Sequence, residues 1–291
     1  MRYVLENQYL RTSFDSYGAE LRSIQRITDG REYMWQANPA YWNRTSPILF
    51  PFVGRLHNLT YTYQDHSYTM MQHGFARDQE FQLVEKEPNQ IFFKLTDTEY
   101  THHIYPFSFE LYIGYILSGN ELTVSWQVTN PNQKMLHFAI GAHPAFNHPC
   151  GEPVPKGSIL LHGFKELQYQ KLDQNRFCLP QKHVLKIPAD GIWHFDKSIF
   201  SEDVYIFPDH QLTEVSLVDS KGIPYLTLES QAPLTGIWSP PGKDAPFICI
   251  EPWYGRCDGA NTPLPLPNKD YINTLSVGET FTATYKIKIH L

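Results

Sequence analysis

Residues 109–129 read FELYIGYILSGNELTVSWQVT, and the pattern within them decides the fold class. Apolar side chains recur at every second position on both sides of Gly119-Asn120, a dipeptide typical of a hairpin turn. Alternation of this kind turns one face of a strand toward a core and the other toward solvent. The stretch therefore predicts two antiparallel strands joined by a short turn.

The same period of two runs through the rest of the chain. It is cleanest at 281–289, and we expect further strands at 2–6, 9–14, 18–27, 32–35, 158–164, 214–220, 225–229 and 234–238. Residues 38–58 contain three prolines among large apolar residues and are expected to form an ordered loop. No window of about a dozen residues has helical spacing and capping, and 196–202 would form a turn or two at most. The pattern predicts one all-β domain over residues 1–291, built as a sandwich or a barrel.

Composition narrows the functional class. The 291 residues are 42% hydrophobic and 19% charged, which is typical of a folded globular protein. A net charge of −6 gives no electrostatic footprint for nucleic acid. The first residues do not form a signal peptide and no stretch is apolar enough to span a membrane, so we expect no membrane partner and a cytoplasmic location. These patterns do not set the oligomeric state, and a homodimer is one candidate assembly.

Signatures of several cofactor-dependent and hydrolytic classes are missing from the sequence. The four cysteines form no CxxC pair and are interpreted as reduced thiols, and the 13 histidines show no spacing typical of a zinc site. There is no GxSxG motif, phosphate-binding glycine loop or dinucleotide fingerprint. We therefore expect neither a metal nor an organic cofactor.

One strand of a different character carries an acidic residue. Residues 247–253 read FICIEPW, and the four β-forming residues at its start leave no polar face, so the strand is expected to be buried. Desolvation at Glu251 would raise its carboxyl pKa toward the range useful for proton transfer. The structural alternative is a strand-end carboxylate in water or in a salt bridge.

Three further polar residues stand out by their surroundings. His73 precedes Gly74, His143 ends an apolar run before Pro144, and Arg55 is a charge within the apolar stretch FPFVGR. The structural alternatives are a surface histidine at a hairpin corner, a core-edge histidine bonded to a carbonyl, and an ion pair that stabilises a loop. Each residue alone is a weak indication of function.

Taken together with Glu251, these residues suit a sugar. A carboxylate base, an imidazole acid and a guanidinium match the hydroxyls of the ring, and aromatic side chains offer flat surfaces to its C–H groups. The aromatic residues near them in sequence are Trp35, Trp42, Phe75, Phe146, Trp238 and Trp253. We select Phe146 and Trp238 among them as sugar-binding candidates.

A two-carboxylate glycosidase is a competing interpretation of the same residues. Such an enzyme needs a second acid facing Glu251 across the scissile bond. Asp203 and Asp258 are the residues that the sequence offers for that role.

At these residues the chain resembles the aldose 1-epimerase (galactose mutarotase) family, most closely its LacX-like branch. The resemblance runs nearly end to end and rests on GAELRSI at 18–24, YWNRTSPILFPFVGRLHN at 41–58, HGFARD at 73–78, FELYIGYIL at 109–117, GAHPAFN at 141–147 and the segment TGIWSP to ICIEPWYGRCD at 235–258. SPILFPFVGR, HGFAR and ICIEPW in this order are specific together.

The resemblance implies a single large antiparallel β-sandwich and interconversion of aldose anomers without metal or organic cofactor. By motif, Glu251 matches the catalytic base and His143 the catalytic acid. His73 and Arg55 match sugar-binding residues, and Asp203 is the nearest match to an aspartate that holds substrate hydroxyls. The opposite charges of an ionised Glu251 and a protonated His143 would stabilise each other. The sequence His-Pro-Ala-Phe departs from the His-Ser-Tyr-Phe-like form of true galactose mutarotases, which concerns the choice of sugar more than the chemistry.

Two other functions remain open on the same scaffold. A hexose-6-phosphate 1-epimerase would need a basic cluster for the phosphate, and Arg55 and Arg77 are candidates that would fit a neutral sugar equally well. A non-catalytic carbohydrate-binding protein would keep the fold and lose turnover. The predicted partner is in each case a small-molecule sugar, either a hexose or a hexose phosphate.

Overall fold

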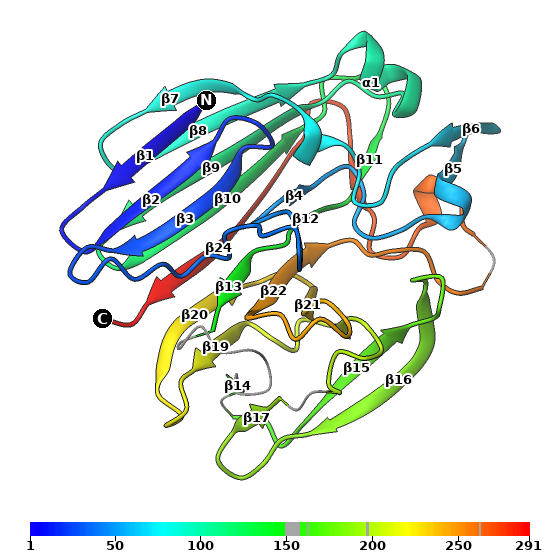
Figure 1. Cartoon of the computed structure of the whole chain (residues 1–291). Helices are drawn as coiled ribbons and strands as arrows, with labels where there is room; N and C mark the ends of the chain where they lie inside the picture. The colour runs from blue at the N-terminus through cyan, green and yellow to red at the C-terminus, as the bar shows by residue number, and fades with distance from the viewer. Residues whose placement is uncertain (149–157, 162, 196–197, 262) are drawn as a thin grey trace.

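The computed structural model describes residues 1–148, 158–161, 163–195, 198–261 and 263–291, which are mostly antiparallel β-structure. The all-β prediction is therefore confirmed. The largest sheet has the order β17-β14-β19-β20-β24-β10-β9-β8-β7 (Figure 1). Its strands are β7 (Gln82–Lys86), β8 (Gln90–Thr96), β9 (Glu110–Ser118), β10 (Glu121–Thr129), β14 (Ser158–Leu160), β17 (Ile192–His194), β19 (Glu214–Val218), β20 (Pro224–Ser230) and β24 (Thr280–Ile289).

The hairpin predicted from 109–129 lies in the middle of this sheet. Its two strands, β9 and β10, pair in register around the turn, and β24 adds to the other edge of β10. Along β10 the even-numbered residues from Leu122 to Val128 are buried, as the alternation requires.

A second large sheet has the order β16-β15-β18-β21-β22-β12-β4, with β13 also paired to β22. Its strands are β4 (Ile48–Leu49), β12 (Ile140–Ala142), β13 (Ala145–Asn147), β15 (Glu166–Leu172), β16 (Cys178–Lys186), β18 (Tyr205–Phe207), β21 (Leu234–Trp238) and β22 (Phe247–Tyr254). The smaller sheets are β1 (Arg2–Glu6), β2 (Leu10–Asp15) and β3 (Glu20–Arg26); β5 (Thr60–Tyr63) with β6 (His66–Thr69); and β11 (Leu136–Phe138) with β23 (Asn273–Leu275).

Aromatic contacts between the sheets form the core. Trp126 of β10 and Tyr254 of β22 lie edge to face at 6.2 Å between ring centroids, which joins the two large sheets. The three-stranded sheet lies over β8 and β9 (Figure 1), where Phe14 contacts Tyr115 at 4.3 Å between centroids. The Tyr115 hydroxyl donates to the Ala19 carbonyl at 2.6 Å. The chain is thus a β-sandwich extended by a smaller sheet.

Helical structure is confined to short segments within the described ranges. These are α1 (Glu99–Ile104) and the 3₁₀ turns η1 (His57–Leu59), η2 (Ala76–Asp78) and η3 (Leu266–Asn268). The helix α1 is absent from the predicted elements because six residues are too few to show a helical period. Thr98 and Thr101 form a capping box at its start. Of the strand expected at 32–35 only isolated bridges form. The turn expected at 196–202 lies partly outside the described residues.

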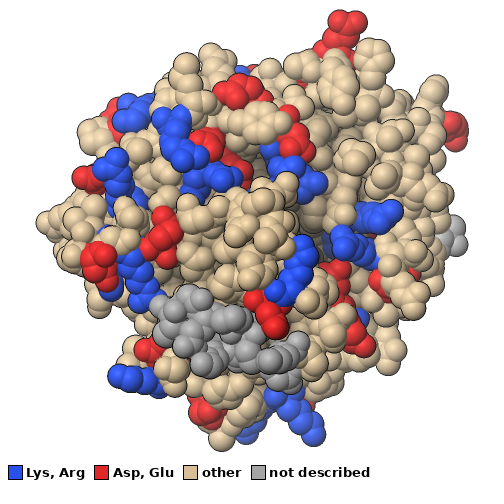
Figure 2. Space-filling model, in the orientation of Figure 1, with Lys and Arg blue, Asp and Glu red and all other residues tan. Residues whose placement is uncertain are grey.

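The surface carries both signs of charge. Figure 2 shows basic and acidic side chains intermixed on the left-hand side of the face drawn there. Among the residues that the structure describes, no helix has the length and apolar character needed to cross a bilayer.

Candidate active site

Glu251 and His143 occupy opposed positions of neighbouring strands. β22 pairs with β12 through Gly141 and Trp253, and with β13 through Ala145 and Cys249. The ladder is interrupted between β12 and β13, at His143-Pro144. The register of the two flanking pairs places His143 opposite Glu251. Side chains opposed in this way on one face of a sheet are close neighbours.

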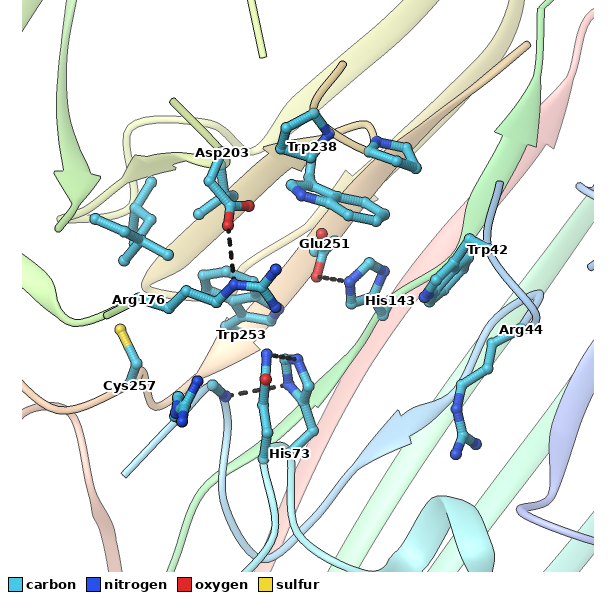
Figure 3. Close-up of a pocket in the computed structure, with 18 of the residues that line it drawn as sticks. Trp42, Arg44, His73, His143, Arg176, Asp203, Trp238, Glu251, Trp253 and Cys257 are labelled. Carbon is cyan, nitrogen blue, oxygen red and sulfur yellow. Dashed lines mark hydrogen bonds and ion pairs between the residues drawn. The ribbon is translucent and has the colours of Figure 1, made fainter. Parts of the chain in front are cut away.

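The two side chains meet in a buried contact (Figure 3). His143 Nε2 lies 3.3 Å from Glu251 Oε2, and the two side chains are only 10% and 1% exposed. Neither Glu251 Oε2 nor His143 Nδ1 has a hydrogen-bond partner among the described residues. The indole of Trp42 stacks on the His143 ring at 4.7 Å, and Trp238 meets it edge-on at 5.3 Å. The imidazole is therefore fixed between two aromatic rings, and the pair has two buried polar atoms without a hydrogen-bond partner in the described part of the chain.

Burial moves the proton affinities of this pair in opposite directions. Desolvation raises the pKa of Glu251 well above its ordinary value, and the negative charge of Asp203 adds to the effect. Desolvation lowers the pKa of His143 to about 3, with the positive charge of Arg77 contributing. Burial therefore favours a protonated Glu251 beside a neutral His143. The sequence predicts the ionised pair, whereas in the structure the loss of solvation outweighs the mutual attraction of the charges.

His73 is held as a neutral hydrogen-bond donor. Its Nδ1 accepts from the Gly54 amide at 3.1 Å, and its own amide donates to the Gly54 carbonyl at 2.9 Å. Burial, followed by the charge of Arg77, lowers the pKa of His73 well below the ordinary value. With Nδ1 accepting in a neutral ring, the proton resides on Nε2, and the Gln72 side-chain amide, whose nitrogen lies 3.1 Å away, has to turn its oxygen toward Nε2 to accept from it. The His73 and His143 rings are 5.8 Å apart.

The loop between His73 and Phe75 depends on a glycine. Gly74 has φ +73°, and a Cβ atom there would lie 2.2 Å from the Phe50 carbonyl oxygen. That same oxygen accepts from the Phe75 and Ala76 amides at 3.0 and 3.1 Å. Only glycine combines this backbone conformation with so close an approach. The HGF motif is thus a means of packing His73 against the 50–54 loop.

A cavity of about 510 Å³ opens over these residues, a size typical of small-molecule sites. It is lined by Tyr41, Trp42, Arg44, Gly54, Arg55, Gln72, His73, Arg77, His143, Leu172, Arg176, Asp203, Val204, Ile206, Trp238, Pro240, Pro241, Lys243, Glu251, Trp253 and Cys257. Six of the seven candidates from the sequence analysis therefore share one cavity: Glu251, His143, His73, Arg55, Asp203 and Trp238. Their substrate contacts remain predictions.

Arg55 and Asp203 reach the cavity from different loops. The Arg55 guanidinium has no hydrogen bond or ion pair within the described part of the chain, while its carbonyl accepts from the Asp258 amide at 3.0 Å. Asp203 Oδ2 lies 3.5 Å from Arg176 Nε (Figure 3). Asp203 has φ +70°, an uncommon conformation for a residue with a side chain.

The loop at 38–58 is ordered by buried polar contacts. Glu20 Oε1 accepts from the amides of Thr45 and Ser46, both at 2.8 Å. Trp35 Nε1 donates to the Trp42 carbonyl at 2.9 Å. These bonds hold the segment that carries Trp42 and Arg44 against the sandwich. The prediction of an ordered loop here is confirmed, with β4 as its one short strand among the described residues.

Two residues proposed from the sequence lie elsewhere. Phe146 is fully buried in the main core, because it is one position out of phase with His143 and Ala145 and so faces the opposite side of the sheet. It is not a sugar-binding residue in this structure. Asp258 is also buried, where it pairs with Lys269 and accepts from the His57 amide at 2.9 Å. That position removes Asp258 as a second glycosidase acid.

Several polar residues of the cavity wall are not among the candidates predicted from the sequence: Arg44, Gln72, Arg176 and Lys243. Arg44 lies in the loop already singled out and could have been chosen as its second cation. Arg176 lies in the turn between β15 and β16, and Lys243 follows two prolines and a glycine. Neither has a local sequence signal, because the sheet topology alone brings those turns to the cavity.

The Cys249 thiol lies beside Glu251 and His143. One donor atom each from His143, Cys249 and Glu251 falls within 4.8 Å of the others, a spacing that a metal ion could use. Burial raises the pKa of the Cys249 thiol well above its ordinary value, so this thiol keeps a proton that a metal would have to displace. The absence of a metal therefore remains a prediction.

The chain is similar over its whole length to sugar-epimerase proteins. The family model described as aldose 1-epimerase matches residues 1–288. Protein LacX (chromosomal) of Lactococcus lactis subsp. lactis is 32% identical, with 99% of each chain covered. A galactose mutarotase related enzyme from Lactobacillus acidophilus superposes with a TM-score of 0.93 at 32% identity, covering 100% of this chain and 98% of the other. A galactose mutarotase-like protein from Lactobacillus casei gives 0.91 at 29% identity, with both chains covered completely.

Proposed function

Because the chain belongs to the aldose 1-epimerase family, we propose that it interconverts the α and β anomers of a hexose by opening and closing the sugar ring. The observation that carries the proposal is the buried 3.3 Å contact between His143 Nε2 and Glu251 Oε2 on the wall of a sugar-sized cavity. A base and an acid at this separation can act on two oxygens bonded to the same carbon. The anomeric hydroxyl and the ring oxygen of an aldose are such a pair.

Ring opening moves two protons. Glu251 removes the proton of the anomeric hydroxyl, the C1–O5 bond breaks to give the aldehyde, and His143 protonates the departing O5. Rotation about the C1–C2 bond then presents the other face of the carbonyl. Closure runs the transfers in reverse, with His143 taking the O5 proton and Glu251 returning one to O1, which gives the other anomer.

The pair needs one proton in total, and its position changes during the cycle. Opening starts from an ionised Glu251 and a protonated His143, and it ends with a protonated Glu251 and a neutral His143. This second state is the one that burial favours. The low-dielectric surroundings would therefore stabilise the pair while the sugar is open, and ring closure returns it to the ionised Glu251 and protonated His143 from which opening starts.

The other cavity residues would bind and orient the ring. His73 Nε2–H and the Arg55 guanidinium supply donors for sugar oxygens, and Asp203 supplies an acceptor for hydroxyl groups. Trp42 and Trp238, packed around His143, offer aromatic faces for the C–H side of the sugar. Positioning of the anomeric carbon against a fixed acid and base is the contribution that such contacts make to rate.

The test is polarimetry with freshly dissolved α-D-glucose and α-D-galactose. The proposal predicts that the protein speeds the approach to anomeric equilibrium in proportion to its concentration. Sugar binding without any acceleration would instead indicate the non-catalytic carbohydrate-binding protein. A glycosidase with Asp203 as second carboxylate would release the aglycone from an aryl hexoside, which the epimerase would leave intact.

A further inference from the structure

Trp253 lies in the cavity wall with a buried indole N–H that has no hydrogen-bond partner in the described part of the chain. The residue is only 6% exposed. A buried indole N–H without an acceptor is uncommon, because the group loses its bound water on folding and gains no bond in return. This donor is therefore a candidate for a role in the site.

Two glycines determine where the indole lies. Trp253 pairs with Gly141 of β12 on one side of β22, and Gly236 of β21 pairs with Glu251 on the other side. A Cβ atom at Gly141 would lie 2.8 Å from Trp253 Cδ1, and one at Gly236 would lie 2.8 Å from Cζ2 and Cη2. Neither glycine has a positive φ, so the indole and not the backbone excludes a side chain at these positions. The ring therefore extends across β22, from the β12 side to the β21 side.

This placement turns the N–H edge of the indole toward Glu251. Nε1 lies between Cδ1 and the six-membered ring, so it belongs to the edge that runs from Gly141 to Gly236. Glu251 is two positions earlier on the same face of β22, opposite Gly236. Burial and then the charge of Asp203 raise the pKa of Glu251, and the Trp253 side chain is close enough to act in the opposite direction as a donor (Figure 3). Neither Trp253 Nε1 nor Glu251 Oε2 completes a hydrogen bond within the described residues.

The strength of this contact depends on the charge of Glu251. A hydrogen bond to an ionised carboxylate is about twice as strong as one between neutral groups. The N–H would therefore close on the carboxylate when Glu251 ionises. The ionisable groups that face Glu251 are His143 at 3.3 Å, Cys249 and Asp203, and β21 places only Gly236 opposite it. An indole N–H differs from these groups because it stabilises a negative charge without itself titrating.

We propose, on the basis of the epimerase function above, that Trp253 is a positioning residue whose indole N–H binds the Glu251 carboxylate and holds it in the orientation that takes the anomeric proton. Each member of the proton-transfer pair then has its own tryptophan support. Trp42 and Trp238 hold His143 by ring contacts, and Trp253 holds Glu251 by a hydrogen bond.

The kinetic test replaces Trp253 by phenylalanine and, separately, by β-(3-benzothienyl)alanine, which keeps the ring shape but has sulfur in place of the N–H group. Both changes should lower kcat for the hexose anomer by about 10- to 100-fold, the range for a hydrogen bond to a charged group, with KM changed less. Loss of the donor disfavours the carboxylate, so the alkaline limb of kcat/KM should move to higher pH. Wild-type kcat in the folded benzothienyl protein would overturn the proposal.

Two further variants check specificity, and melting curves confirm that each is folded. Trp193→Phe changes a tryptophan of β17 that is also 6% exposed, and it should leave kcat unchanged. Gly236→Ala should lower kcat by displacing the indole, but it should add little to Trp253→Phe, whose shorter side chain lacks the atoms that the new Cβ would meet. Fully additive losses would contradict a shared route through Glu251.

An NMR measurement separates this inference from the proposed function. The six tryptophans give six indole N–H signals in protein labelled with ¹⁵N-tryptophan, and Trp253→Phe identifies the signal of Trp253. Glu251→Leu removes the acceptor, so the Trp253 indole proton should move upfield while the Trp193 signal stays in place. An unmoved Trp253 signal would overturn the contact even in an active epimerase. The upfield shift in a protein without mutarotase activity would support the contact and refute the epimerase.

Discussion

His143 Nε2 lies 3.3 Å from Glu251 Oε2, and burial shifts the pKa values of the two residues away from each other. The pair consequently holds a single proton over a wide range of pH. The His143 pKa, lowered to about 3, governs the gain of a second proton, and the raised pKa of Glu251 governs the loss of the first. A pair of this kind is matched to a reaction that needs one acid and one base at the same time.

The pH dependence of kcat/KM follows from these directions. Activity should persist as the pH falls from 7 to about 5, although an ordinary imidazole with a pKa of about 6.5 would be protonated over that range. It should decline on the alkaline side as the pH passes through the raised pKa of Glu251. Polarimetry from pH 4.5 to 9, corrected for the uncatalysed rate at each pH, measures the profile. An acid-side loss centred near pH 6.5 would contradict the neutral resting pair.

Replacement of the sugar-binding candidates should separate binding from chemistry. Arg55→Ala and His73→Asn are each expected to raise KM by about tenfold and to change kcat less, because they remove donors to the sugar and leave the proton-transfer pair in place. Initial rates over a range of sugar concentrations give both constants. His66→Asn, at an exposed position on β6, is the matched control and should change neither. A fall in kcat without a change in KM would indicate that these residues act in the chemical step rather than in sugar binding.

Glu251 should destabilise the folded protein at neutral and alkaline pH. A carboxyl whose pKa is raised by folding binds its proton more tightly in the folded state, so stability is lost as the pH rises above the unfolded value of about 4.3. Glu251→Gln lacks this titration. Its melting temperature relative to wild type should therefore increase from pH 5 to pH 8, and Glu6→Gln, at an exposed site where Glu6 pairs with Arg11, is the control for removal of a carboxylate. A relative melting temperature that is constant or falls with pH would refute the raised pKa.

Gly74 should be needed for the architecture of the His73 loop. Gly74→Ala adds a Cβ atom 2.2 Å from the Phe50 carbonyl oxygen in a left-handed conformation. Gly119→Ala has a similar strain, with φ +56°, but meets no atom within 4 Å, and it should cost about 1–2 kcal/mol from the backbone alone. Urea unfolding should show a clearly larger loss for Gly74→Ala. Equal losses of unfolding free energy in the two variants would mean that the His73 loop accommodates the added Cβ atom at little energetic cost.

Much of the fold follows from local pattern. The two strands on either side of Gly119-Asn120 and the strand at 281–289 each have an unbroken period of two, and they appear in the structure as β9, β10 and β24. The helix α1 was missed because its six residues are fixed by a capping box rather than by an apolar stripe. Local sequence thus predicted long regular elements and not short ones.

The candidate site was predictable only as a set of residue types. Glu251 and His143 were identified from their surroundings and the family resemblance, but their opposition depends on the register between β22 and the β12–β13 segment. The same register explains the error at Phe146, which a shift of one residue turns into the core. Arg44, Arg77 and Arg176 are far apart in sequence, and only the folded loops bring them to the wall of one cavity.

The account depends most on the proton-transfer roles of Glu251 and His143, and polarimetry of Glu251→Gln tests them most directly. With a freshly dissolved α-anomer that wild type turns over, kcat should fall by about 10²–10⁴-fold, with sugar affinity by calorimetry largely retained. His143→Asn should show the same pattern. Wild-type rates of mutarotation in a folded Glu251→Gln protein would contradict the central claim.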